Sequence, residues 1–186
     1  MHRYTWKEAF ADALEAAKHG KPPYQNFVGY CYDMGRGVRQ DVKLAMYWYE
    51  KAAQNGSIAG MFNLALMCET GKVTQRNAKR ATALYEQAAK KGHLQAQTNL
   101  AIRYLEGRGV ERNLAEGIRL LRKAARRGDD KAQYNLGRAY LDGEGIRINE
   151  SHAKSWLSKA ASGGHSRARR LLKSMQRKAN RSRSNS

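Results

Sequence analysis

Small and apolar residues recur at helical spacing in two stripes within the stretch from residue 129 to residue 164. The first stripe comprises Ala132, Leu136, Gly137 and Tyr140, and the second comprises Ala153, Trp156, Leu157, Ala160 and Ala161. Residues three and four positions apart share one face of an α-helix. A glycine-containing turn at 142–146 separates the stripes, and Gly163-Gly164 is a typical helix stop. This stretch therefore predicts a helical hairpin.

The hairpin pattern repeats along the chain at a fixed interval. The motif Ala-Ala-x-x-Gly ends at five glycines, each 36 residues after the last: Gly20, Gly56, Gly92, Gly128 and Gly164. A fixed period of this length is typical of solenoids, in which each repeat buries its apolar face against its neighbours. We therefore predict an all-α solenoid of antiparallel helical hairpins with a 36-residue period.

The period also predicts the boundaries of one elongated domain. The first apolar residues of the chain align with the second helix of later hairpins, and Pro22-Pro23 breaks the chain after them. The last residues are too polar to fold alone. The expected segments are an N-terminal capping helix at 1–21, repeats at 22–56, 57–92, 93–128 and 129–164, a basic capping helix at 165–179 and a disordered tail at 180–186.

Local signals support the hairpins. Ser57 and Asp129 follow repeat-ending glycines and are good helix N-caps, and His93 and His165 hold the same register position. The turn within each hairpin carries Gly-x-Gly, except in the second repeat, where Val73 replaces the second glycine. Since a valine adopts a positive φ angle only at high cost, we expect a different turn there.

Charge and cysteine content narrow the class of protein. The formal net charge is +19 over 186 residues, which favours acidic partners such as nucleic acid, an anionic membrane surface or an acidic protein. The two cysteines, Cys31 and Cys68, differ in register, so we expect free thiols and a reducing compartment. Charged residues interrupt the first apolar run, and no stretch is long enough to span a membrane. A cytoplasmic protein without a membrane span is expected.

Recognisable catalytic chemistry is absent from the sequence. The Gly-x-Gly turns lack the Lys-Ser/Thr of a phosphate-binding loop, and the five histidines form no metal-ligand spacing with the cysteines. There is no Gly-x-Ser-x-Gly nucleophile motif either. We predict a non-enzymatic protein with no catalytic residue, metal or cofactor.

The stretches at 132–146 and 156–164 contain Leu-Gly-x-x-Tyr, then Gly-x-Gly, then Lys-Ala-Ala-x-x-Gly, in that order. With these motifs the chain resembles the Sel-one-like repeat (SLR) family, a subgroup of tetratricopeptide-like α/α solenoids, over residues 4–178. The resemblance implies a right-handed superhelix whose first helices line a concave face, used as a scaffold or adaptor for protein complexes. Many members are bacterial, and some exported ones are cysteine-rich penicillin binders. The paired cysteines of those members are missing here.

Residues that point away from the packing stripe of each first helix would line the concave face that the resemblance implies. If residues 96, 100 and 104 face the core, residues 98 and 102 lie nearly opposite at 100° per residue. An exposed apolar strip commonly serves a partner. The predicted groove consists of the apolar strip Tyr30, Phe62, Leu66, Ile102 and Tyr134, the amides Asn63, Asn99 and Asn135, and Arg138.

Two alternatives for this groove stay open. Each asparagine could pair with the backbone of a bound peptide, or it could bond the neighbouring repeat and belong to the fold itself. The apolar strip could likewise receive a partner or be buried by tight packing between repeats.

A basic patch is the third candidate site. Its residues lie on the second helix of the third repeat and along the basic end, where no acidic residue follows His165: Arg119, Arg122, Arg126, Arg167, Arg169, Arg170, Lys173, Arg177 and Lys178. Such a patch could be a solvated cap, or it could bind phosphates with strong salt dependence.

The primary hypothesis is a protein–protein adaptor that holds an acidic or amphipathic partner segment in the groove, with the basic end accelerating capture. The alternative is a solenoid that binds nucleic acid through the basic patch. The sequence leaves the oligomeric state open.

Overall fold

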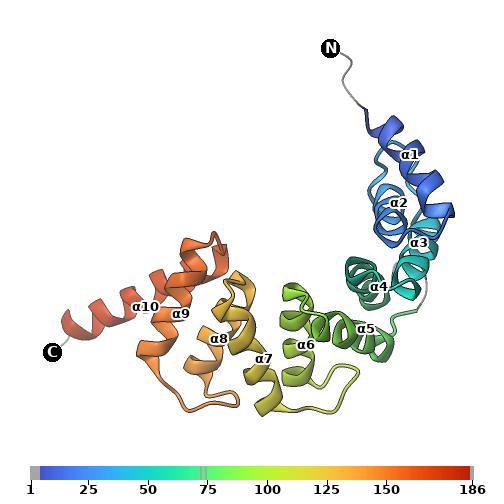
Figure 1. The fold of residues 1–186 in the computed structure, drawn as a ribbon. Coiled ribbons are helices and arrows are strands. Elements are labelled where there is room, and N and C mark those ends of the chain that lie inside the picture. The colour runs from blue at the N-terminus through green and yellow to red at the C-terminus, as the bar shows by residue number, and fades with distance from the viewer. Residues whose placement is uncertain (1–4, 72, 74, 185–186) are drawn as a thin grey trace. The chain divides into compact units, whose positions relative to one another are not determined.

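The computed structural model describes residues 5–71, 73 and 75–184. Across these residues the chain forms ten α-helices and no strand (Figure 1). None of these helices is long and apolar enough to cross a lipid bilayer. In chain order the helices are α1 (Trp6–Lys18), α2 (Pro22–Met34), α3 (Val42–Gln54), α4 (Ile58–Thr70), α5 (Ala78–Lys90), α6 (Leu94–Glu106), α7 (Leu114–Arg126), α8 (Asp130–Asp142), α9 (Glu150–Ser162) and α10 (Ser166–Ser184).

The helices follow the predicted hairpin order. Hairpins α2–α3, α4–α5, α6–α7 and α8–α9 make four repeats, with α1 before them and α10 after them (Figure 1). The chain divides into two compact units, one of residues 1–96 with 108–110 and one of residues 97–107 with 111–186. We call these unit 1 and unit 2, and α6 contributes residues to both.

Each first helix packs closely on the second helix of its own repeat because a small residue lies at the crossing. A Cβ atom on Gly29 would lie 2.7 Å from the Tyr49 ring, and one on Gly137 would lie 2.8 Å from Leu157. Tyr49 and Leu157 are fully buried as a result. Burying one such large side chain stabilises the fold by roughly 1.5–3 kcal/mol.

The four predicted N-caps are also confirmed. The backbone N–H of the third following residue donates to Ser57 Oγ at 3.1 Å, to Asp129 Oδ1 at 2.7 Å, to His93 Nδ1 at 3.3 Å and to His165 Nδ1 at 3.2 Å. Each bond satisfies one of the N–H groups that a helix leaves unpaired at its start.

The Gly-x-Gly turns need their second glycine for two reasons. Gly37, Gly109 and Gly145 have φ angles of +72°, +71° and +70°. A Cβ on Gly37 would also collide with the backbone of Trp6, at the start of the preceding second helix. Within the described part of the chain no residue other than glycine has a positive φ angle. Val73 takes the place of the second glycine in the second repeat, and because residues 72 and 74 lie outside the described residues, the different turn expected there stays a prediction.

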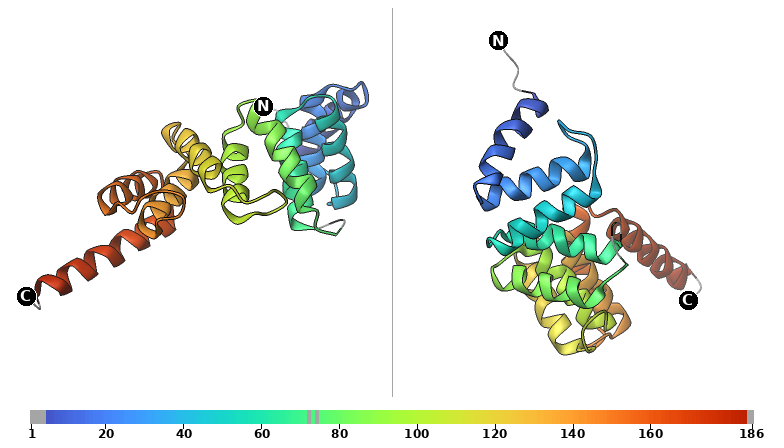
Figure 2. Two further views of the ribbon diagram at one scale, coloured as in Figure 1. Left: turned by 90° about the horizontal axis from the view of Figure 1, so that it is seen from below. Right: turned by 90° about the vertical axis from the view of Figure 1, so that its right-hand side faces the viewer.

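The C-terminal helix is longer than the sequence suggested. Ala168 and Leu172 of α10 pack against Leu157 of α9, while the helix continues to Ser184 (Figure 2). Residues 180–184, expected to belong to a disordered tail, are helical, and residues 185–186 lie outside the described residues, as do residues 1–4 of the N-terminal cap. Extending a helix that packing has already nucleated costs little per residue.

Both cysteines lie in unit 1, Cys31 on α2 and Cys68 on α4. They are buried and form no disulfide, as predicted. Burial raises the pKa of both thiols, since the thiolate would lose its hydration.

Candidate partner-binding groove

The predicted groove residues divide between the two units. Unit 1 holds Tyr30, Phe62, Asn63 and Leu66, and unit 2 holds Asn99, Ile102, Tyr134, Asn135 and Arg138. Each unit thus carries its own part of the predicted groove.

In unit 2, four of the predicted residues line one cleft between α6, α8 and the start of α10. The cleft has a volume of about 620 Å³. Its lining comprises Ile102, Glu106, Asp130, Lys131, Tyr134, Asn135, Arg138, Gly164, His165, Ser166 and Arg167. The sequence pattern thus brought Ile102, Tyr134, Asn135 and Arg138 to one site.

An apolar wall of this cleft is held in place by a ring stack. The Tyr134 and His165 rings lie 4.5 Å apart between centroids, with 20° between their planes. His165 also caps α10 through Nδ1. Because the imidazole is fixed by both contacts, Tyr134 presents one defined face beside the half-buried Ile102.

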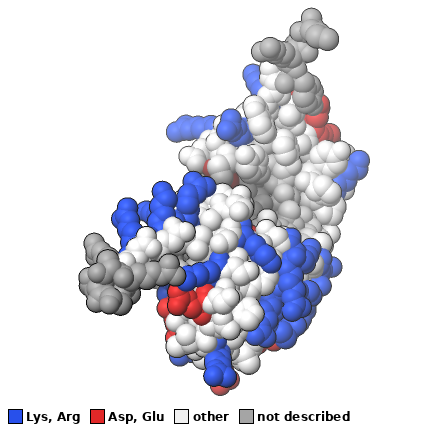
Figure 3. All heavy atoms as spheres, turned by 90° about the vertical axis from the view of Figure 1, so that its left-hand side faces the viewer, with Lys and Arg blue, Asp and Glu red and all other residues white. Residues whose placement is uncertain are grey.

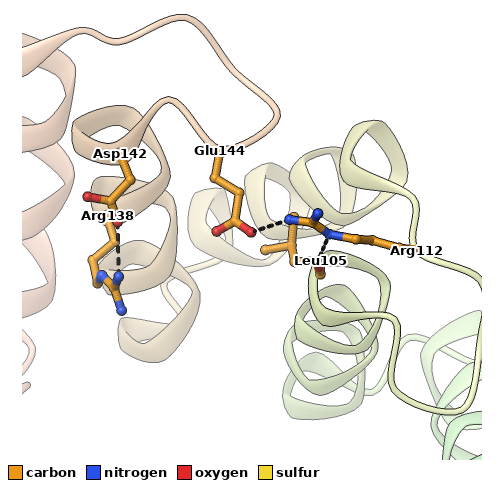
Figure 4. A network of polar contacts seen from close by, with 5 residues as sticks. All are labelled: Leu105, Arg112, Arg138, Asp142 and Glu144. Carbon is orange, nitrogen blue, oxygen red and sulfur yellow. Dashed lines mark hydrogen bonds and ion pairs between the residues drawn. The ribbon is translucent and has the colours of Figure 1, made fainter.

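The cationic rim of the cleft is positioned by hydrogen bonds. Lys131 Nζ donates to Asn99 Oδ1 at 2.8 Å. Arg138 donates to Asp142 Oδ2 at 2.9 Å (Figure 4), and this bond raises the pKa of the Arg138 guanidinium. Arg167 adds a third exposed cation at the start of α10. The exposed ion pair contributes little to stability, but it orients the guanidinium.

The loop that follows α8 is tied to the preceding repeat next to this rim. Arg112 Nε donates to the Leu105 carbonyl oxygen at 2.7 Å, and its guanidinium pairs with Glu144 at 3.1 Å (Figure 4). One side chain thereby links the end of α6 with the turn between α8 and α9.

In unit 1, packing between repeats covers part of the predicted apolar strip. The Phe62 ring stacks on His93 with 4.5 Å between centroids, and Tyr30 lies 6.5 Å from Trp6 by the same measure. Burial lowers the pKa of His93. Leu66 is the most open member of the strip in unit 1, with 36% of its surface exposed. The strip therefore belongs partly to the fold, and its use by a partner stays a prediction.

The asparagine ladder bonds neighbouring repeats in two of its three members. Asn63 Nδ2 donates to Asn26 Oδ1 at 2.9 Å, and Asn99 accepts from Lys131. Asn135 instead donates to the Lys131 carbonyl oxygen within its own helix, at 2.8 Å. These bonds favour the structural role left open by the sequence, and contact with a peptide stays a prediction.

One expected position is wrong. Residue 98 was placed opposite the core together with residue 102, but Thr98 is fully buried. Its hydroxyl donates to Asp129 Oδ1 at 3.0 Å. The side chain is small enough to be covered by the following repeat, so the helical wheel of a single helix misplaced it.

The predicted basic patch lies on two helices. Arg119 forms two 2.6 Å hydrogen bonds with Glu116, which lower the pKa of the Glu116 carboxyl. Arg122 and Arg126 are exposed on the same helix, as are the basic residues of α10: Arg167, Arg169, Arg170, Lys173, Arg177 and Lys178. On the face drawn in Figure 3, Lys and Arg gather in patches with few Asp and Glu among them.

Sequence reasoning assigned none of the other seven lining residues to this groove, among them Lys131 and His165, and it placed Arg167 only in the basic patch. Sequence spacing could have predicted them, because residues 31 to 33 positions apart in the sequence meet across neighbouring first helices. In the described ranges of the chain no group of three or more His, Cys, Asp or Glu side chains is arranged to hold a metal ion.

Comparison with known proteins supports the repeat assignment. The Sel1 repeat family model matches residues 22–57, 58–93, 94–129 and 130–165. A Sel1 repeat protein from Oxalobacter formigenes is 27% identical in sequence, with a TM-score of 0.86, over 90% of this chain and 67% of that one. The protective antigen c5321 of uropathogenic Escherichia coli, which displays an SLR fold, is 34% identical with a TM-score of 0.79.

The coverage of the relatives is partial. The match with c5321 covers 83% of this chain but 33% of the antigen. The chitin synthase regulator SKT5 of Saccharomyces cerevisiae is 48% identical over 48 residues, which are 26% of this chain and 7% of that protein. The four matched repeats cover most of the present sequence, however. The chain therefore belongs to the Sel1 repeat family, and its fold is an all-α superhelical solenoid with a period of about 36 residues.

Proposed function

We propose that this protein is a non-enzymatic adaptor that binds an amphipathic, acidic segment of a partner protein in the cleft of unit 2. Sel1 repeat proteins are in general scaffolds for protein interaction. The observation that carries the proposal is the cleft itself, about 620 Å³ in volume, with Ile102 and Tyr134 on its wall and three cations at its rim.

The chemistry of the cleft suggests what such a segment presents. Its apolar side chains would pack on Ile102 and Tyr134, where burial of apolar surface supplies affinity. Its carboxylates would meet Lys131, Arg138 and Arg167, and an arginine binds a carboxylate with two parallel hydrogen bonds. Glu106 and Asp130 also line the cleft, so a purely acidic segment fits less well than an amphipathic one.

Long-range electrostatics favour the same partner. The formal charge of +19 attracts an acidic segment before contact. This attraction raises the association rate and weakens with salt, whereas the apolar contacts in the cleft are insensitive to moderate salt.

A peptide library displayed on phage tests the proposal without requiring that the partner be identified first. Selection against the full chain should enrich peptides that combine acidic and large apolar residues. Binding of the enriched peptides, measured by calorimetry, should weaken about ten-fold or more in Ile102→Ser and in Tyr134→Ser, because each removes part of a small apolar contact.

Ile148→Ser is the matched control, since Ile148 is an isoleucine with 65% of its surface exposed and does not line this cleft. Circular dichroism of each variant checks that it stays folded. Enriched peptides that bind the two cleft variants as tightly as the unchanged chain would show that the cleft is not the binding site.

Nucleic-acid binding is the alternative function, and it draws on the exposed basic side chains of α10 and α7. A gel shift with double-stranded DNA over increasing salt separates the two proposals. Binding through phosphates weakens steeply with salt and depends on Arg170 and Arg177, whereas the adaptor proposal requires no tight complex with DNA. A cytoplasmic location stays a prediction that the two buried free thiols favour.

A further inference from the structure

The first and last helices, α1 and α10, each correspond to half of a hairpin. Trp6 at the start of α1 lies four periods before Glu150 at the start of α9, so α1 has the register of a second helix. Ser166 at the start of α10 lies one period after Asp130 at the start of α8, so α10 has the register of a first helix. No other helix of the described residues completes either hairpin.

Beside α1 there is a cleft where a first helix would lie. It has a volume of about 520 Å³ and is lined by Ala9, Asp12 and Ala13 of α1 and by Pro23, Tyr24 and Phe27 of α2. One period later, Ala13 corresponds to Tyr49, the residue that packs on the first helix of its own repeat at Gly29. The α1 cleft therefore lies where the first helix of a hairpin would pack.

On α10 the surface that a second helix would cover is partly open. Leu172 corresponds to Leu136, which is fully buried in the complete repeat α8–α9. Leu172 and its neighbours Leu171 and Met175 are only half-buried, although they contact α9. An apolar face of this kind is commonly covered by a partner.

We propose that α10 of one copy docks in the α1 cleft of a second copy, so that two half-hairpins form one complete repeat. The 36-residue period sets the register of this pairing. In the complete repeat α8–α9, Gly137 of the first helix crosses Leu157 of the second. Lys173 and Ala13 hold the corresponding positions on α10 and α1, so Lys173 of one copy would lie against Ala13 of the next.

The sizes of these two residues are the reverse of those inside the chain, and they match. Within each repeat a small residue of the first helix meets a large residue of the second. Gly29 meets Tyr49 and Gly137 meets Leu157 at this crossing, and the same register positions of the other two repeats hold Ala65 with Tyr85 and Ala101 with Leu121. In the proposed contact the first helix carries the large Lys173 and the second carries the small Ala13. The volume at the crossing is thereby conserved.

The charges match as well. Asp12, next to Ala13, is exposed where the four repeats carry Trp or Leu. It would lie beside the Lys173 ammonium of the other copy. Asp12 is the acidic residue of α1 that lines the cleft; Glu8 and Glu15 also lie on α1, together with Lys7 and Lys18, whereas α10 carries no acidic residue. The carboxylate of Asp12 and the basic face of α10 have opposite charges, which favours this partner over a purely apolar occupant and this register over others.

An aromatic contact extends the pairing onto α2. Asn63 bonds Asn26 across neighbouring first helices, and Phe27 and Arg170 hold the corresponding register positions in the proposed contact. The Phe27 ring is stacked on Trp6 with 6.1 Å between centroids, and Trp6 is 46% exposed. The Arg36 guanidinium already lies 5.5 Å from the Trp6 ring centroid. The Arg170 guanidinium would therefore meet this aromatic pair at Phe27, to which a cation is attracted.

Such a contact joins two different surfaces, so it builds rings or open chains of copies. Sedimentation velocity of the full 186-residue chain over a range of concentrations tests it. The unchanged chain should form species larger than a monomer below about 1 mM, which is the weak limit of specific association. Raising the salt concentration should dissociate them, since the contact is charged.

Charge reversal tests the register directly. Asp12→Lys and Lys173→Glu should each weaken self-association roughly ten-fold or more, because like charges then face one another. A mixture of these two variants should associate again, since the lysine introduced at position 12 of one copy meets the glutamate introduced at position 173 of the other. In the same mixture, Asp12 of the Lys173→Glu copy and Lys173 of the Asp12→Lys copy form the unchanged pair, so the two kinds of copy can alternate. The double variant D12K/K173E should also associate.

Glu111→Lys and Lys123→Glu are the matched controls, because both residues are exposed and lie on neither cap helix. They should leave self-association unchanged. The proposal is overturned by a chain that stays monomeric at every concentration, by single reversals that associate as the unchanged chain does, or by a mixture that stays monomeric. Either of the last two results would mean that the oligomer forms through a different surface, and the α1 cleft would then have a different occupant.

Discussion

Three junctions between successive first helices fall into two kinds at one register position. Phe62 stacks on His93 in unit 1, and Tyr134 stacks on His165 in unit 2. The third junction, in unit 2, pairs the Thr98 hydroxyl with the Asp129 carboxylate. The partners are 31 residues apart in every case, and the second of them caps the helix that follows.

The difference between the two kinds is in burial. The aromatic junctions stay half-open to solvent, whereas Thr98 is 0% exposed and Asp129 8%. A small polar pair lets the neighbouring repeats close over it, and a ring pair holds part of its surface at the groove. The same pair of register positions thus forms either a sealed junction or part of the proposed binding surface, depending on the size of two side chains.

The largest effect is expected from breaking the sealed junction. Asp129→Ala removes an N-cap, worth about 1 kcal/mol, and the hydrogen bond that the Thr98 hydroxyl donates to the carboxylate; a hydrogen bond to a charged group is worth about 1.5–3 kcal/mol. We expect the free energy of unfolding to fall by about 2–4 kcal/mol, measured by urea denaturation.

Thr98→Val and the double variant complete a mutant cycle for this junction. If the two side chains act together, the double variant should lose less stability than the two single variants added. Asp130→Ala is the control, because Asp130 is the neighbouring acid and does not contact Thr98. A loss in Asp129→Ala no larger than that of the control would contradict the sealed junction.

A smaller effect is expected from breaking an aromatic junction. His93→Ala removes a cap and a ring stack, and the expected loss is about 1–2 kcal/mol. His93→Asn keeps a capping side chain but removes the ring, so it should lose about half as much. Equal losses in the two variants would mean that the stack with Phe62 contributes nothing. Thermal melts followed by circular dichroism distinguish these outcomes.

The smallest effect is expected from pH, and it is specific to the aromatic junction of unit 1. Burial holds the pKa of His93 below the ordinary value of 6.5, so the unfolded chain binds a proton more readily than the folded one. The contribution of the neutral ring is complete above pH 6.5 and decreases as the pH falls below that value towards the lowered pKa. The melting temperature should drop less between pH 7.5 and pH 5.5 in His93→Asn than in the unchanged chain.

The fold was largely predictable because its signals are periodic. The repeated glycines gave the hairpins, and the residues after them gave the caps, including His93 and His165. The family match places each repeat boundary one residue later than predicted, at 57 rather than 56 for the first. The C-terminal helix was underestimated because the polarity of residues 180–184 hides a helix that is nucleated further back.

The site was predictable only in part, because a helical wheel describes one helix at a time. It grouped Ile102 and Tyr134, which both line the unit 2 cleft, and put Thr98 wrongly beside them, since Thr98 is buried. Exposure at these positions depends on which side chain the next repeat brings, and that side chain is 31 residues away in the sequence. Lys131 and Arg167 likewise line the cleft because the following first helix brings them there.

The two buried thiols allow the local unfolding of unit 1 to be followed by chemical modification. Cys31 and Cys68 both lie in that unit, and unit 2 contains no cysteine. An alkylating reagent can modify them only when the surrounding helices unfold locally. The rate at which the chain gains mass in native buffer therefore reports how often unit 1 opens. A change in this rate on addition of a partner segment that binds unit 2 would show that binding at unit 2 alters the local stability of unit 1. The measurement needs no engineered label.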